Sequence, residues 1–194
     1  ALNSSTVSLT GGYSTATSIA SHEIRNLFEP LTPRFTLNNT IQSSFDYTFN
    51  GNDFTIDLWV RRTAIDETHG LLSNMGPDAT GWQLFIATDG SPTFRFGNSG
   101  TWIANPAVEG DNSGFESFDS AQALNKWRHL SATREEDTYK LYVDGTFVGS
   151  GTNTTDITDI NTHLRIGRWR DADPSYFQGY MDEIRIVKGE ARPP

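Results

Sequence analysis

The stretch Phe54-Thr-Ile-Asp-Leu-Trp-Val60 carries an apolar residue at every second position. Successive side chains of a β-strand point to opposite faces of a sheet, so Phe54, Ile56, Leu58 and Val60 share one face. Alternation of this length is typical of a strand that is buried on one side. The sequence therefore predicts a strand here, with one face directed at a core.

Two Asp-Gly pairs separate further segments of the same kind. Asp89-Gly90 lies between Trp82-Gln-Leu-Phe-Ile86 and Thr93-Phe-Arg-Phe96, and Asp144-Gly145 lies between Tyr139-Lys-Leu-Tyr-Val143 and Thr146-Phe-Val148. The Asp-Gly pair favours the type I′ turn, which needs positive φ at both central residues and joins antiparallel strands. We therefore predict two β-hairpins.

Other segments extend the same pattern along the chain. Further strands are predicted at 69–75, 126–134, 163–168 and 177–187. Many short strands separated by turn signals are typical of an all-β, antiparallel sandwich or barrel. The stretches 97–123, 149–161 and 168–175 lack the alternation and are predicted to be long rim loops, where binding surfaces commonly lie.

One segment has helical spacing instead. Within 21–31, the apolar residues Ile24, Leu27, Phe28 and Leu31 follow the i, i+3, i+4, i+7 pattern. This pattern allows two interpretations. The segment is either one or two helical turns that pack on the edge of the domain, or part of an N-terminal arm that docks on a partner subunit.

Composition excludes several classes of protein. The chain has 194 residues, a formal net charge of −9 and no cysteine. An acidic surface disfavours nucleic acid, because such binding depends on Lys and Arg that neutralise phosphates. No apolar run approaches the roughly 18 residues of a membrane span, so no membrane insertion is expected. The absence of cysteine excludes thiol nucleophiles, cysteine zinc sites and disulfide scaffolds.

The order of the segments resembles that of laminin-G-like, concanavalin A-like jelly rolls. The motifs that carry the resemblance are Asp53-Phe-Thr-Ile-Asp-Leu-Trp-Val60, Gly70-Leu-Leu-Ser73, Gly81-Trp-Gln-Leu-Phe-Ile86, Lys126-Trp-Arg-His-Leu-Ser-Ala132, Leu141-Tyr-Val-Asp-Gly145, Leu164-Arg-Ile-Gly167 and Phe177-Gln-Gly-Tyr-Met-Asp-Glu-Ile-Arg-Ile-Val187. The ending Arg185-Ile-Val-Lys-Gly-Glu-Ala-Arg192 resembles modules in bacteriophage virion and tail proteins. The resemblance covers about residues 33–192 and implies a sandwich of two antiparallel sheets. Because the first residues do not match the family, we divide the chain into an arm or short helix over 1–32 and the sandwich over 33–194.

Aromatic residues in the predicted loops are candidates for ligand binding. A loop tryptophan can stack on the apolar face of a sugar, and it can equally anchor a loop or a subunit contact. The candidate ligand-binding residues are Trp102, Arg168, Trp169, Arg170, Asp171, Asp173 and Tyr176. Trp59, Trp82 and Trp127 lie in predicted strands and are expected to be packing residues.

Asp182 is the most informative acid. Along a regular strand it shares a face with Tyr180, Ile184 and Ile186, which suggests that it points toward the core. A buried carboxylate must be hydrogen-bonded, paired or bound to a metal ion. Asp182 is therefore expected to be a structural acceptor or a ligand of Ca²⁺, and Asp182→Ala to cost a few kcal/mol of stability. Acids in the predicted loops offer further candidate Ca²⁺ ligands.

The sequence favours a non-enzymatic function. The Glu-x-Asp-x-x-Glu pattern of hydrolases with this type of sandwich is absent. We expect a virion or extracellular surface module, such as a capsid decoration or tail component, that forms a homo-oligomer and stabilises partner subunits. The alternative is a lectin-like module that binds host or cell-surface glycans. A glycoside hydrolase is the least favoured interpretation.

Overall fold

The computed structural model describes ten segments of the chain. They comprise residues 5–9, 40–42, 49–64, 68–76, 80–98, 101–102, 108–109, 124–157, 163–170 and 173–194. The helix-like segment with Ile24, Leu27, Phe28 and Leu31 lies outside the described residues, as does Asp171. The proposed docking role of that segment therefore stays a prediction.

The described residues form two sheets and no helix. A six-stranded sheet has the order β1 (Ser5–Leu9), β15 (Gly179–Lys188), β3 (Phe54–Arg62), β9 (Arg128–Glu135), β10 (Thr138–Val143) and β11 (Thr146–Thr152). A nine-stranded sheet follows the path β13 (Arg168–Arg170), β14 (Asp173–Tyr176), β4 (His69–Ser73), β5 (Gly81–Ile86), β6 (Pro92–Asn98) and β7 (Thr101–Trp102). Off this path, β12 (His163–Ile166) pairs with β2 (Thr40–Gln42) and β4, and β8 (Val108–Glu109) pairs with β6.

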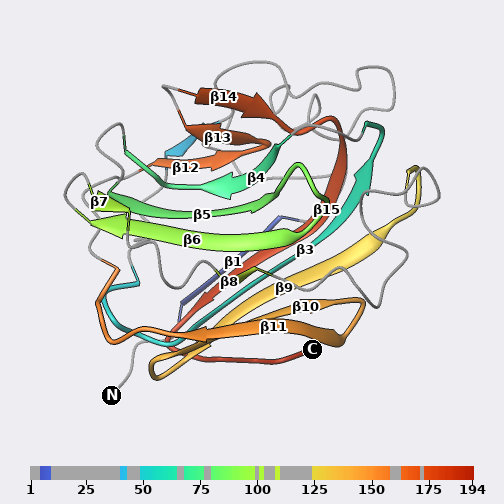
Figure 1. Cartoon of the computed structure of the whole chain (residues 1–194). Coiled ribbons are helices and arrows are strands. Elements are labelled where there is room, and N and C mark those ends of the chain that lie inside the picture. Colours follow the sequence, from blue (N-terminus) through green and yellow to red (C-terminus); the bar gives the residue numbers. More distant parts are fainter. Residues whose placement is uncertain are drawn as a thin grey trace.

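The two sheets stack face to face, as Figure 1 shows. The predicted all-β sandwich of antiparallel sheets is thus confirmed, and among the described strands one pair, β14 and β4, is parallel. Phe54 of β3 stacks on Phe49 at 4.0 Å and lies 5.3 Å from Phe94 of the opposite sheet, measured between ring centroids. Alternate residues of facing strands fill the space between two sheets in this way.

The Asp144–Gly145 hairpin forms as predicted, and the Asp89–Gly90 turn differs. Asp144 and Gly145 have φ of 49° and 77°, as a type I′ turn requires. At the other turn only Gly90 has positive φ, and five residues separate β5 from β6. The Asp89 carboxylate accepts hydrogen bonds from the Ser91 hydroxyl (2.5 Å) and N–H (2.9 Å), which lower the pKa of Asp89. This side-chain turn replaces the expected two-residue turn.

Two further expectations are modified by the strand pairing. β1 lies within the predicted arm, and it pairs with β15 as the edge strand of the six-stranded sheet. Residues 168–175, predicted to be a loop, contribute to the β13–β14 hairpin instead. The two strands have three and four residues, which is too short for the alternation to be recognised in the sequence.

A bulge in β15 overturns the prediction that Asp182 faces the core. Asp182 pairs with Trp59 and Arg185 pairs with Asp57, so β15 has one more residue than β3 between these positions. Glu183 takes up the extra position with φ of 48°. Such a bulge changes which residues point inward. Met181 and Ile184 are therefore buried, whereas Asp182 is only half-buried and accepts a hydrogen bond from the Glu183 N–H at 2.8 Å.

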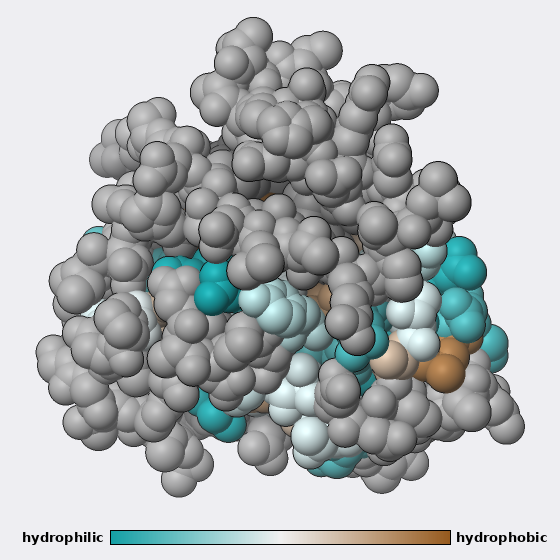
Figure 2. All heavy atoms as spheres, turned by 90° about the horizontal axis from the view of Figure 1, so that it is seen from above, coloured by the Kyte–Doolittle hydropathy of each residue, from teal (hydrophilic) through white to brown (hydrophobic). Residues whose placement is uncertain are grey.

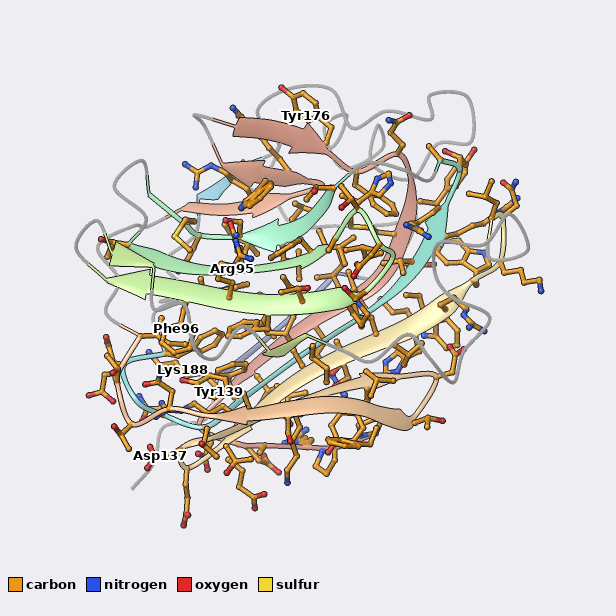
Figure 3. The ribbon with its side chains drawn as sticks, viewed as in Figure 1. Arg95, Phe96, Asp137, Tyr139, Tyr176 and Lys188 are labelled. Carbon is orange, nitrogen blue, oxygen red and sulfur yellow. The ribbon has the colours of Figure 1, made fainter. Side chains whose placement is uncertain are left out.

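Polar groups also lie inside the sandwich, at the end where β9 turns into β10. Figure 3 shows Tyr139 and Phe96 between the two sheets. The Tyr139 ring stacks on Phe96 at 5.3 Å, and the Arg134 guanidinium lies 5.4 Å from the Tyr139 centroid. Both side chains are at most 2% exposed. Burial raises the pKa of Tyr139 to about 12, and the positive charge of Arg134 opposes that rise.

Replacement of Asp182 tests its revised position. We expect Asp182→Ala to lower the free energy of unfolding by about 1 kcal/mol, the usual worth of one partly exposed hydrogen bond. Asp57→Ala is the comparison, because Asp57 is 6% exposed and receives two hydrogen bonds from Arg185, at 3.0 and 2.8 Å. It should cost more, about 2–3 kcal/mol. Urea denaturation measures both, and a loss of several kcal/mol for Asp182→Ala would contradict its outward position.

Alkaline titration tests the interior position of Tyr139. Its folded pKa of about 12 exceeds the value of about 10 in an unfolded chain. Between these values the unfolded state loses its proton first, so stability is full below pH ~10 and falls as the pH rises toward ~12. The absorbance of tyrosinate should show a late-titrating group that Tyr139→Phe removes. If Tyr139→Phe instead removes absorbance that develops near pH ~10, Tyr139 is in contact with water.

Candidate functional site

The outward face of the nine-stranded sheet, here called the upper face, carries two rows of side chains. Leu72, Leu84 and Phe94 face the core, so their neighbours along each strand point away from it. Cross-strand pairing places the first row as Arg165, Ser73, Gln83 and Arg95, and the second as Tyr176, Gly70, Phe85 and Thr93. Figure 3 shows Arg95 and Tyr176 on this side of the molecule.

Polar side chains of these rows are buried although they lie outside the core. Ser73 and Gln83 are 0% exposed, Thr93 is 1% exposed and Arg165 is 5% exposed. Arg165 donates a hydrogen bond to the carbonyl of Met75 at 3.2 Å. By contrast, Nε2 and Oε1 of Gln83 and Oγ1 of Thr93 have no hydrogen-bond partner among the residues that the structure describes. A buried polar atom without a partner costs about 1–3 kcal/mol, so these atoms are candidates to bind a polar ligand.

An aromatic pair lies beside the unpartnered atoms. Trp169 of β13 stacks on Phe85 of β5 with ring centroids 5.2 Å apart and 14° between their planes. The Arg95 guanidinium carbon lies 5.1 Å from the same Phe85 centroid. The Trp169 indole Nε1 is buried and has no hydrogen-bond partner within the described part of the chain. The upper face thus combines aromatic surface, amide and hydroxyl groups, and arginine donors.

The space-filling view agrees with this mixed character. Figure 2 looks down on the molecule from above the view of Figure 1. The described residues visible from that side range from hydrophilic to strongly hydrophobic.

The structure brings together part of the cluster predicted from the sequence. Arg168 pairs with Tyr176 across the β13–β14 hairpin, and its guanidinium carbon lies 5.9 Å from the Tyr176 ring centroid. Trp169 extends from the same hairpin to Phe85. The backbones of Arg170 and Asp173 also pair in this hairpin, but their side chains lie outside the described part. The binding roles of these residues stay predictions.

Trp102 lies apart from that hairpin in the strand order. It belongs to β7, which pairs with β6 at one end of the nine-stranded path, whereas β13 is at the other end. Its side chain lies outside the described residues. Trp102 and Trp169 are therefore not neighbours within the sheet, and a single ligand would have to span it to contact both.

Of the three tryptophans expected to be packing residues, one is buried and two are exposed. Trp82 is 0% exposed, which confirms it as a packing residue. Trp59 and Trp127 are 36% and 42% exposed, so their assignment as packing residues was wrong. The Trp59 side chain points away from the core, from the outward side of β3, and Trp127 comes just before β9. The alternation of β3 already places Trp59 outside, because its neighbours Leu58 and Val60 are both inside.

Sequence reasoning also missed Gln83, Phe85, Thr93 and Arg95. All four belong to the β5–β6 hairpin, and all four lie opposite to its core-facing residues. Their positions follow from the alternation of Trp82, Leu84 and Ile86 once these are known to face inward. The signal was therefore available in the sequence.

The described residues hold no group of three or more His, Asp and Glu side chains that would suit a metal ion. Asp182 lies beside the bulge with the Glu183 N–H as a hydrogen-bond partner. Calcium binding by Asp182, or by acids of the predicted rim loops, stays a prediction. The structure contains no helix, within the residues it describes, that is long and apolar enough to cross a membrane.

Several solved structures share this architecture. The chain is similar to domain 4 of AbnA, a GH43 extracellular arabinanase from Geobacillus stearothermophilus, in complex with arabinotriose. The TM-score is 0.54 and the sequence identity is 22%, and the match covers 76% of this chain and 66% of that chain. It is also similar to domains LG4-5 of the mouse laminin alpha1 chain. The TM-score is 0.57 and the sequence identity is 19%, and the match covers 78% of this chain and 39% of that chain. A third similar structure is the CBM40 of Ruminococcus gnavus IT-sialidase bound to alpha2,3 sialyllactose. The TM-score is 0.57 and the sequence identity is 12%, and the match covers 75% of this chain and 79% of that chain.

These similarities show a common fold. The chain spans less than two thirds of the first two structures, at 66% and 39% of their lengths. Among curated proteins, comparison of the sequence found no match. None of the three structures named above is a virion component, so the resemblance to bacteriophage virion and tail modules stays a prediction.

A family model gives the assignment directly. The model Laminin_G_3, described as the concanavalin A-like lectin/glucanases superfamily, matches residues 36–193. The matched range contains every strand of the sandwich except β1. This chain therefore belongs to the Laminin_G_3 family of the concanavalin A-like lectin/glucanases superfamily.

Proposed function

We propose that this protein is a non-catalytic carbohydrate-binding module with an extracellular or surface location, and that its upper face holds the sugar. The observation that carries this proposal is the set of buried, unpartnered polar atoms beside an aromatic pair. Gln83 offers an amide N–H and an amide oxygen, and Thr93 offers a hydroxyl. Sugar hydroxyls both donate and accept hydrogen bonds, so they match this combination of groups.

The aromatic pair supports the same ligand class. The C–H face of a sugar ring is apolar and packs on aromatic side chains, while its hydroxyls remain available to polar neighbours. Phe85 and Trp169 supply the aromatic surface, and the unpartnered Trp169 Nε1–H supplies a donor at its edge. A purely apolar ligand would leave Gln83 and Thr93 unsatisfied, so the chemistry favours a polyhydroxylated one.

The described groups of the upper face support binding over hydrolysis. A glycosidase needs two carboxylates that flank the scissile bond, about 5 to 9.5 Å apart. Among the side chains that the structure describes in the two rows, the ionisable groups are Arg165, Arg95 and Tyr176, and none is an acid. These groups can hold a saccharide but cannot act as a nucleophile and acid pair.

The proposal also includes the setting of the module. The sequence-based expectation is a virion surface or tail, in a homo-oligomer that contacts partner subunits. A binding module of this kind is compatible with that setting and with any other extracellular assembly. Purification of the native protein with the particle or surface that carries it would identify the setting, and its mass in solution would give the oligomeric state.

A Gln83→Met variant tests the site, since methionine has the size of glutamine without its polar atoms. If Gln83 serves a ligand, the variant should be as stable as the wild type or more stable by about 1 kcal/mol, because an unsatisfied buried amide is removed. Its affinity for sugars bound by the wild type should fall about tenfold, which corresponds to one or two lost hydrogen bonds. Trp169→Ala should weaken binding at least as much.

A glycan array followed by calorimetry measures these effects. Phe147→Ala is the matched control, because Phe147 is 53% exposed on the other sheet. It should bind sugars as the wild type does. An array that stays blank for the folded protein contradicts the proposal. Unchanged affinity in Gln83→Met would move the sugar away from the upper face, and a large loss of stability would show a structural role for the amide.

A further inference from the structure

The outward face of the six-stranded sheet, here called the lower face, has a different character. Trp59 lies on β3, which has two strands of the sheet on one side and three on the other. Its cross-strand neighbours are Asp182 on β15 and His129 on β9. The Trp59 and His129 rings lie 5.3 Å apart at 53°. With 36% of its surface exposed, Trp59 is an aromatic residue that water reaches in the middle of a sheet.

A carboxylate and an imidazole face each other beside Trp59. Asp57 lies two residues before Trp59 on the same side of β3. Its Oδ2 accepts hydrogen bonds from both Nε and Nη2 of Arg185, at 3.0 and 2.8 Å. Its Oδ1 lies 3.9 Å from Nε2 of His129, which is longer than a hydrogen bond. A hydroxyl group between these atoms can accept from a protonated Nε2 and donate to Oδ1.

The charges around Trp59 balance. Asp57 forms an ion pair with Arg185 at 2.8 Å, and Asp182 lies across from Trp59. Arg61 is the next residue of β3 on this face. Its guanidinium carbon lies 5.4 Å from the Tyr180 ring centroid. Two acids and two arginines therefore surround the indole. The net charge of the whole chain is −9. These charges favour a neutral ligand over an anionic one.

The C-terminal segment bounds this surface at one end. Thr55 donates a hydrogen bond from Oγ1 to the Glu190 carbonyl at 3.0 Å and accepts one from the Arg192 N–H at 2.7 Å. The segment after β15 thus crosses the lower face at Thr55, and Figure 1 shows it running below the six-stranded sheet. Trp59 lies four residues further along β3, about 13 Å away. The indole consequently stays open while the Thr55 end is covered.

We propose that the lower face carries a second binding site, for a neutral saccharide, centred on Trp59 and independent of the upper face. The indole provides the surface on which a sugar ring stacks, and Asp57 and His129 provide an acceptor and a donor for its hydroxyls. A protein interface is built around several adjoining apolar anchors that exclude water. Here the side chains beside and across from Trp59 are the polar Asp57, Arg61, His129 and Asp182, and the Tyr180 ring lies beyond Arg61.

Nuclear magnetic resonance of the full chain tests this site with a named set of probes. The probes are neutral linear oligosaccharides of glucose, xylose, mannose and galactose. We expect at least one of them to shift the indole N–H of Trp59 and the amides of Asp57 and His129 in a saturable way. Trp59→Ala should weaken that binding about tenfold or more, and Trp59→Phe should restore part of it. Phe147→Ala, which removes an exposed aromatic residue of the same sheet, should leave it within about twofold.

Three results would overturn the proposal. One is that no probe shifts the Trp59 signal in the wild type, and another is that Trp59→Ala binds as the wild type does. The third is that the signals of Trp59, Asp57 and His129 shift on dilution alone, which would identify the lower face as a contact between copies of the chain.

The Gln83→Met variant separates the two sites. If both proposals hold, the Trp59 signals of this variant shift as in the wild type, while the upper face loses affinity. If saccharides shift only upper-face signals, the second site is refuted and the first survives. If they shift only the signals around Trp59, the first is refuted and the second survives.

Discussion

The packing of β3 against the opposite sheet is the constraint on which the rest of the structure depends. Phe54, Ile56, Leu58 and Val60 are each at most 1% exposed. Burial of such a side chain contributes about 1.5–3 kcal/mol, so these positions have a strong preference for the space between the sheets. A shift of one residue in register would bring Asp57 and Trp59 into the core. The inward packing therefore determines what the outward face presents.

The same sorting gives two outward faces with different chemistry. On the upper face, Gln83 and Thr93 are buried with unpartnered atoms beside Phe85 and Trp169. On the lower face, Trp59 is open to water within a frame of charged and polar groups. Both sets of residues lie outside the hydrophobic cluster. The two proposed binding sites are built from them.

Much of this structure follows from period-two alternation, and what does not follow has identifiable causes. Strands such as β3, β5, β9 and β10 and the Asp144–Gly145 hairpin could be predicted because apolar spacing and turn residues agree at these places. The outward direction of Asp182 could not, since one extra residue at Glu183 changes the alternation and leaves no mark in the composition. The stacking of Trp169 on Phe85 joins strands separated by β14 and β4, and neither segment alone indicates it.

The accessibility of individual tryptophans tests most directly whether β3 separates the core from an outward face that is open to water. Incorporation of fluorotryptophan gives one fluorine signal for each of the five tryptophans, and single Trp→Phe variants assign them. A soluble paramagnetic agent broadens the signals of residues that it can approach. The account predicts strong broadening for Trp59 and Trp127, which are 36% and 42% exposed, and none for Trp82, which is 0% exposed. A protected Trp59, or a broadened Trp82, would contradict it.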